Sequence, residues 1–127
     1  MSEIRATTIS DLAGTGPATL TKQSAAKAWL NFNGSGTVAI RDSFNVSGLS
    51  DNGTGDYTIS YTNSMAGADN YSVTGCAGEN TTSMRAICQN RNLAAPLAGS
   101  VRVQSIRGDG DIQDCSTGYT AIHGDLA

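Results

Sequence analysis

The chain has 127 residues and a mass of 13.0 kDa, which is enough for one compact domain. Aromatic residues make up 6% and charged residues 15%, while 15 glycines punctuate the sequence, a composition typical of turn-rich all-β domains. The formal net charge is −3 and no run of lysine or arginine occurs, which argues against a nucleic acid partner because phosphate binding needs concentrated positive charge.

Residues 1–26 differ from the rest of the chain because they show no sustained hydrophobic period. We expect an arm that is extended at first and helical for a turn or two over 21–27, where alanines favour helix. A terminal segment is ordered only when it packs on something, so this arm is a candidate for anchoring or trimerisation. The residues expected at an oligomer or anchoring interface are Leu12, Leu20 and Trp29.

From residue 27 onward the pattern changes to period two, which predicts one β domain over 27–127. In the stretch AWLNFN, Ala28, Leu30 and Phe32 share one face and are predicted to be buried. Trp29 lies on the opposite face of this strand. It is therefore a candidate for packing against the arm or a neighbouring protomer.

A glycine-containing turn at 33–36 separates this strand from a second one over 38–46. Asp42 interrupts the apolar row of the second strand, and a polar residue at such a place indicates a β-bulge or a strand end. The residues predicted to share the buried face are Val38, Ile40, Phe44 and Val46.

The pair Asn52-Gly53 predicts a hairpin, because both residue types accept positive φ. The strand that follows is half-buried by its alternation, with Tyr57, Ile59 and Tyr61 on one face. Near the end of the chain, Ile106 is out of phase with the preceding valines, which indicates another bulge. Further strands are expected over 71–75, 83–89, 101–106 and 119–124. About seven strands at this spacing predict a small antiparallel β-sandwich or barrel.

Three cysteines, Cys76, Cys88 and Cys115, leave at least one thiol unpaired, and none stands in a metal-binding spacing. We expect buried or half-buried free thiols, with a Cys76–Cys88 bridge across a hairpin as the open alternative. Only one histidine, His123, is available, so neither a metal site nor a cofactor is predicted.

No apolar run approaches the roughly 18 residues that a membrane span needs. The start of the chain, MSEIRATTISD, lacks the basic-then-apolar order of a signal peptide. We therefore expect a protein that is made in a cytoplasm and has no membrane partner.

The run KAWLNFNGSGTVAIRDSFNVSGLSDNGTGDYTISYTN, residues 27–63, resembles a module of tailed-bacteriophage virion proteins, especially tail fibres and related appendages. The stretches ADNYSVTG and YTAIHGD extend the resemblance over about residues 17–125, and it weakens between Cys76 and Asp114. The resemblance implies a β-sandwich head, similar to the H-type lectin sandwich, that assembles as a homotrimer on a virion made in the host bacterial cytoplasm.

Enzymatic interpretations have little support, because one histidine and no phosphate-binding loop leave no catalytic constellation. The chain is therefore expected to be non-enzymatic. The stretch GDGDIQD resembles a calcium loop, but Gln113 stands in the place of the third acidic residue, which favours a solvated turn.

Binding is the better supported role, because an exposed tyrosine beside Asn or Asp is a common way to hold a sugar. Tyr57, Tyr61 and Tyr119 stand at alternating strand positions and are assigned structural roles. The loops expected to meet a ligand cover 64–70, 76–83, 90–99 and 108–116. The candidate ligand-binding residues are Tyr71, Asn80, Arg91, Asp109 and Asp111.

The sequence thus predicts a structural protein of a tailed-phage virion, a tail-fibre or tail-appendage component that contributes to recognition of host-surface polysaccharide. The alternative is a capsid decoration or head-fibre protein that is attached to the shell through residues 1–26. The expected partners are further copies of the chain, other virion proteins and host polysaccharide.

Overall fold

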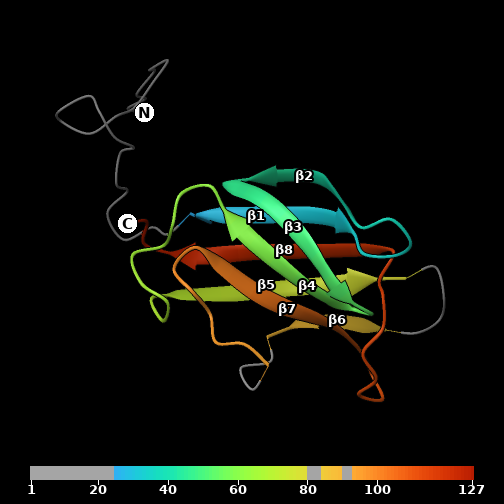
Figure 1. The fold of residues 1–127 in the computed structure, drawn as a ribbon. Helices are drawn as coiled ribbons and strands as arrows, with labels where there is room; N and C mark the ends of the chain where they lie inside the picture. The colour runs from blue at the N-terminus through green and yellow to red at the C-terminus, as the bar shows by residue number, and fades with distance from the viewer. Residues whose placement is uncertain (1–24, 80–83, 90–92) are drawn as a thin grey trace, which may run out of the picture.

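The computed structural model describes residues 25–79, 84–89 and 93–127, and these contain eight β-strands and no α-helix (Figure 1). All neighbouring strands pair antiparallel, which confirms the predicted all-β antiparallel fold. The expected arm, with its short helix over 21–27, lies largely outside the described residues. The strands are β1 (Ala28–Asn33), β2 (Ala39–Phe44), β3 (Val46–Gly53), β4 (Asp56–Tyr61), β5 (Tyr71–Gly78), β6 (Arg85–Cys88), β7 (Ser100–Arg107) and β8 (Thr117–Gly124).

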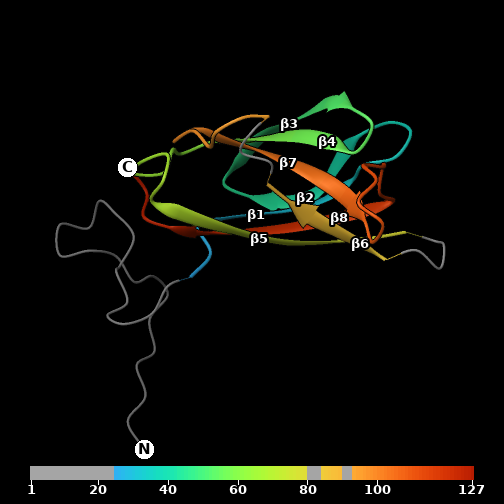
Figure 2. The ribbon, with the colours of Figure 1, turned by 90° about the horizontal axis from the view of Figure 1, so that it is seen from below.

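The strands form one continuous sheet in the order β2-β1-β8-β5-β6-β7-β4-β3. The sheet is strongly curved, so that β1, β8 and β5 lie in one layer and β3, β4 and β7 in the other (Figure 2). β6 connects the layers because it pairs with β5 on one side and with β7 on the other. The sheet is therefore nearly closed into a barrel, and it does not separate into the two sheets of a sandwich.

Asn45 separates β2 from β3 and bridges the two layers at one end of the barrel. Its φ of 55° is left-handed, a conformation that asparagine adopts more readily than most residues. The side-chain amide donates to the carbonyl oxygen of Lys27 at 3.0 Å and to that of Asn63 at 3.1 Å. The amide oxygen accepts from the backbone N–H of Asn63 at 2.7 Å. Asn45 thus joins the start of β1 to the segment after β4.

The hydrophobic core lies between the two layers and is built from the predicted alternation in β1 and β4. Phe32 of β1 meets Tyr57 of β4 edge-on, with ring centroids 5.0 Å apart. Gly118 of β8 lies under the Phe32 ring, and a Cβ at this position would lie 2.3 Å from ring atoms. The predicted burial is confirmed for Ala28, Leu30, Phe32, Tyr57, Ile59 and Tyr61.

The segment 38–46 does not form one strand, and its predicted buried face is wrong at two of its members. Ile40 is 37% and Phe44 54% exposed. The bulge predicted at Asp42 is confirmed, because the register between β1 and β2 shifts by one residue there. A shift of one residue reverses which side of the sheet a side chain faces, so Phe44 lies beside Trp29 and points away from the core. The division of this segment at Asn45 also explains why eight strands form where about seven were expected.

The hairpin predicted at Asn52-Gly53 is confirmed, since β3 and β4 pair directly. Gly53 pairs with Asp56, which places the turn at Thr54-Gly55, two residues later than predicted.

The bulge predicted at Ile106 is wrong, because β7 pairs with β6 without a shift in register. The inward position is occupied by Ser105, which is fully buried. Ile106 lies on the outer side of the sheet, where it forms an isolated bridge with Ile112. The apolar alternation along β7 is therefore interrupted because the small polar Ser105 occupies an inward position, and not because of a bulge.

The three cysteines are free thiols, as the sequence predicted, but Cys76 and Cys88 are exposed, so the predicted burial is wrong for these two because both side chains point to the outer side of the sheet. Cys76 of β5 lies opposite Ala86 of β6 and not opposite Cys88, so the bridge left open by the sequence is not formed. Cys115 is fully buried, and burial raises the pKa of its thiol.

Candidate interaction surface

The outward side of β1 and β8 carries exposed aromatic side chains. Between the buried residues of β1, Trp29 points outward and is 37% exposed, and Tyr119 of β8 is 47% exposed. Trp29 lies opposite Phe44 of β2 on one side and opposite Ala121 of β8 on the other. Three aromatic rings therefore stand on the same side of the sheet, whereas the sequence predicted an outward position only for Trp29.

Small side chains continue this surface across β5 and β6. Cys76 lies between Tyr119 and Ala86, and Thr74 lies opposite Ala121. We call nine residues of this surface the uncharged face, and Asp42, which lies opposite Asn31 on the same side of the sheet, is a charged residue at its β2 edge. Its members are Phe44, Trp29, Asn31, Tyr119, Ala121, Thr74, Cys76, Ala86 and Cys88.

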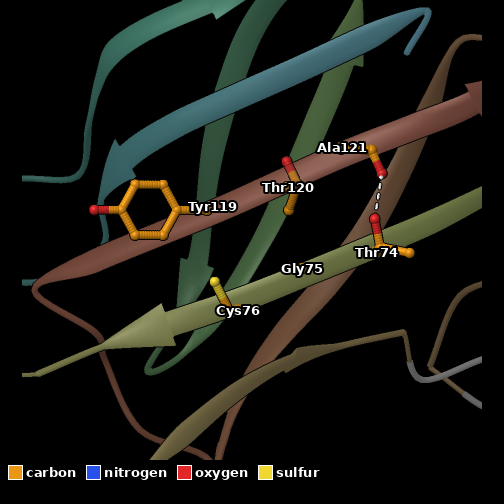
Figure 3. A pocket seen from close by; sticks show the side chains of 6 residues that line it. All are labelled: Thr74, Gly75, Cys76, Tyr119, Thr120 and Ala121. Carbon is orange, nitrogen blue, oxygen red and sulfur yellow. Dashed lines mark hydrogen bonds between the residues drawn. The ribbon is translucent and has the colours of Figure 1, made fainter. Parts of the chain in front are cut away.

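A shallow hollow of about 390 Å³ lies in the middle of the uncharged face, between β8 and β5. Figure 3 shows the Tyr119 ring at one side of this hollow and the short side chains of Thr74 and Cys76 along β5. The Thr74 hydroxyl donates to the Ala121 carbonyl oxygen at 3.4 Å. Gly75 faces inward, and a Cβ there would lie 2.7 Å from the Tyr119 carbonyl oxygen, so a larger residue would push β5 away from β8. The hollow is open to solvent and is large enough to hold an aromatic ring.

The outward side of β4 and β7 has the opposite chemistry. The Asp56 carboxylate accepts from Arg102 Nε at 2.7 Å and from Arg102 Nη2 at 2.6 Å. This guanidinium holds the pKa of Asp56 below its ordinary value. Asn52 of β3 donates to the Thr58 hydroxyl at 2.8 Å. The charges of Asp56 and Arg102 are therefore paired within the chain, whereas the uncharged face presents apolar groups to solvent.

A buried polar cluster fills one end of the barrel interior, and its only signal in the sequence is an arginine in an alternating strand. Arg85 of β6 points inward with a side chain that is 8% exposed. Its Nη2 donates to Gln113 Oε1 at 3.3 Å, and its Nε lies 3.9 Å from the Glu79 carboxylate. Nε and Nη1 of Arg85 make no hydrogen bond. The neighbouring Cys115 thiol is also buried, so this cluster lies inside the barrel and not on a surface that is open to a ligand.

Tyr71, a predicted ligand-binding residue, opens β5 at the end of the sheet where β1 begins. Its hydroxyl lies 3.0 Å from the Leu97 carbonyl oxygen and 3.1 Å from that of Ser100, to which it donates. Its ring meets Tyr61 edge-on at 5.9 Å, and burial raises the pKa of Tyr71. Tyr71 therefore holds the segment before β7 against β5, and only part of its ring is open to a ligand.

Asp109 and Asp111 lie together in the turn after β7, at the opposite end of the sheet from Tyr71. Asp109 accepts from the Asp111 backbone N–H at 3.3 Å and forms an ion pair with Arg107, and both interactions lower the pKa of Asp109. Within residues 25–79, 84–89 and 93–127, no group of three or more His, Cys, Asp or Glu side chains is arranged to hold a metal ion.

The other predicted site residues are Asn80 and Arg91 among the ligand-binding candidates, and Leu12 and Leu20 among the interface candidates. All four lie outside the described residues. Trp29 is the predicted interface residue that the structure places, and it stands on the uncharged face.

No family model, curated protein or solved structure matches the chain. In the part of the chain that the structure describes, no helix combines the length and the hydropathy needed to cross a bilayer. The functional assignment therefore rests on the sequence and on the surfaces of the barrel.

Proposed function

We propose that this protein is a non-enzymatic structural component of a tailed-phage virion, a tail-fibre or tail-appendage protein that contributes to recognition of host-surface polysaccharide. The observation that carries the proposal is the uncharged face, because a contiguous exposed apolar surface marks a protein that acts through contacts. The phage assignment is supported by the motif order within residues 27–63. The two-layered barrel is compatible with an H-type-lectin-like head, and the protein acts as a homotrimer.

In this function, host polysaccharide meets the ends of the barrel. Asp109 and Asp111 offer exposed carboxylate oxygens at one end, and such oxygens accept hydrogen bonds from sugar hydroxyls. Several copies on one particle turn weak single contacts into strong attachment.

A capsid decoration or head-fibre protein is the second candidate function. The observation that favours it is the position of β1, which begins at one end of the barrel and is preceded by residues 1–24. When extended, such a segment spans up to about 80 Å, which is enough to reach across a neighbouring shell protein.

Immunogold labelling of purified virions tests both candidates. We expect label at the tail, whereas label over the head would favour the decoration protein, and virions without label would contradict both.

The recognition step is tested by the binding of purified protein to host cells. We expect the double variant Asp109→Asn, Asp111→Asn to bind at least several-fold less. Asp51→Asn is the matched control, because Asp51 also accepts a backbone N–H two residues ahead, from Gly53 at 3.0 Å, but lies in β3 and not in the turn after β7. Equal binding by all three proteins would remove the Asp109 turn from the recognition site.

A further inference from the structure

We infer that the uncharged face is the surface on which a second copy of this chain packs, body against body. The inference rests on the self-association that belongs to the proposed function, and it names the surface that forms it.

Charge is the first reason for this assignment. The chain carries a formal net charge of −3, so two copies repel each other wherever their charged surfaces meet. Apart from Asp42 at its β2 edge, the uncharged face brings no like charges together and requires no ion to lose its water. The outward side of β4 and β7, with the Asp56–Arg102 pair, would require both.

The second reason is that side-chain size changes across the face. β2 and β1 contribute the large residues Phe44 and Trp29, while β5 and β6 contribute the small residues Cys76 and Ala86. When β1 and β2 of one copy lie over β5 and β6 of the second, large side chains meet small ones. The hollow between β8 and β5 then receives an aromatic ring of the partner copy.

The third reason is area. The strands of this face lie about 4.8 Å apart and rise about 3.3 Å per residue, with eight residues in β8 and β5, six in β2 and β1, and four in β6. The face therefore covers about 500 Å², and two such faces in contact bury on the order of 1,000 Å², which is near the lower limit for a specific protein interface.

A sugar is a poorer fit to the same surface. Sugar sites combine an aromatic ring with several polar side chains, and the polar ones near Tyr119 are Asn31, Asp42 beyond it, and Thr74. The rest of the face offers no hydroxyl, amide or charge at Phe44, Trp29, Ala121, Cys76, Ala86 and Cys88. A neutral protein surface rich in aromatic residues is typical of the centre of a protein interface.

The mass of the full-length protein in solution provides the first test. We expect a multiple of the 13.0 kDa chain mass by light scattering at micromolar concentration. Thr74→Arg places a charge in the middle of the face and should weaken association at least tenfold. Ser50→Arg is the matched control, because it adds the same charge at an exposed position of β3 and should leave the mass unchanged. A monomeric wild type, or a Thr74→Arg protein of unchanged mass, would overturn the inference.

Trp29 provides an independent optical test because it is the single tryptophan of the chain. We expect its emission maximum to move to longer wavelength on dilution, in step with the loss of mass. An emission maximum that does not depend on concentration but moves in the double variant Leu12→Asp, Leu20→Asp would show that the arm covers the face. A maximum that moves only when host polysaccharide is added would show a sugar site. Either result contradicts the inference.

These measurements separate the interface from the proposed function. An oligomer that depends on Thr74 but is absent from virions keeps the interface and removes the virion function. If the protein is monomeric but the antibody labels virions, the interface is removed and the virion function is kept.

Discussion

The outward side of β4 and β7 pairs its charges within the chain, whereas the outward side of β1, β8 and β5 leaves aromatic rings in contact with solvent. The inward sides of the same strands do not differ in this way, since both layers contribute apolar residues to one core. Burial of the inward side therefore accounts for the fold in both layers. The outward sides differ because only the outward side of β4 and β7 satisfies its charged groups within the chain. This contrast is the reason for our proposal that the layer with the uncharged face meets a partner.

The largest expected effect comes from breaking the contact that joins the two layers. Phe32→Ala removes the ring that β1 places against Tyr57, and we expect a loss of about 3–5 kcal/mol in unfolding free energy. Urea denaturation followed by Trp29 fluorescence and by far-ultraviolet circular dichroism measures this loss. Coincident transitions are expected for one cooperative unit. An earlier transition at Trp29 would mean that the layers unfold separately.

A smaller loss is expected when the link at the end of the barrel is removed. Asn45→Ala deletes the bonds to Lys27 and Asn63 and places alanine at a left-handed φ, so we expect a loss of about 2 kcal/mol. Asn45→Gly removes the same bonds without the conformational cost, and thermal unfolding should place it between Ala and wild type. Equal stability of all three proteins would show that the layers do not need this link.

The contribution of the Asp56–Arg102 pair to stability is tested by measuring the unfolding free energy of Asp56→Asn and wild type as a function of pH. Asp56→Asn should cost about 1–2 kcal/mol near neutral pH, because the charge-assisted bonds to Arg102 are weakened. The pKa of Asp56 is lowered in the folded chain, so the unfolded chain takes up the proton first. The stabilisation is therefore present above the ordinary value of 3.8 and is lost as the pH falls through the lowered pKa. The difference between variant and wild type should narrow below pH 3.8, and a difference that is constant with pH would contradict this origin.

The smallest change in unfolding free energy is expected when an arginine is added to the outward side of either layer of the monomer. Thr74 and Ser50 are both exposed, so Thr74→Arg and Ser50→Arg should each change the unfolding free energy by less than about 0.5 kcal/mol at dilutions where association is absent. Chemical denaturation at submicromolar concentration measures this. A large loss in Thr74→Arg alone would mean that the uncharged face has an internal role.

Much of the inward side of the barrel could be predicted from local alternation. The burial of Leu30 and Ile59 follows from period two, because each sits in a strand whose register is not interrupted at that point. The bulge at Asp42 was also visible, but its consequence was not: it reverses the side on which Phe44 lies.

The candidate surface was predictable only at Trp29. The outward position of Tyr119 depends on how β8 pairs with β1 and β5, and alternation within β8 fits two opposite assignments. The left-handed corner at Asn45 depends on partners 18 residues away in either direction, which no local pattern encodes. The outward position of Tyr119 and the corner at Asn45 therefore depend on long-range pairing, which local sequence patterns do not predict.

The course of β1 has a mechanical consequence. The chain enters β1 at one end of the barrel, and Asp109 and Asp111 lie at the other end, so a pull between an anchored arm and a surface held by that turn runs along the strands. β1 is paired on both sides, with β2 and β8, and a lengthwise pull loads these hydrogen bonds in shear. Bonds in shear bear tension together instead of opening one after another. A head built in this way resists extraction by drag along the direction in which it would be anchored.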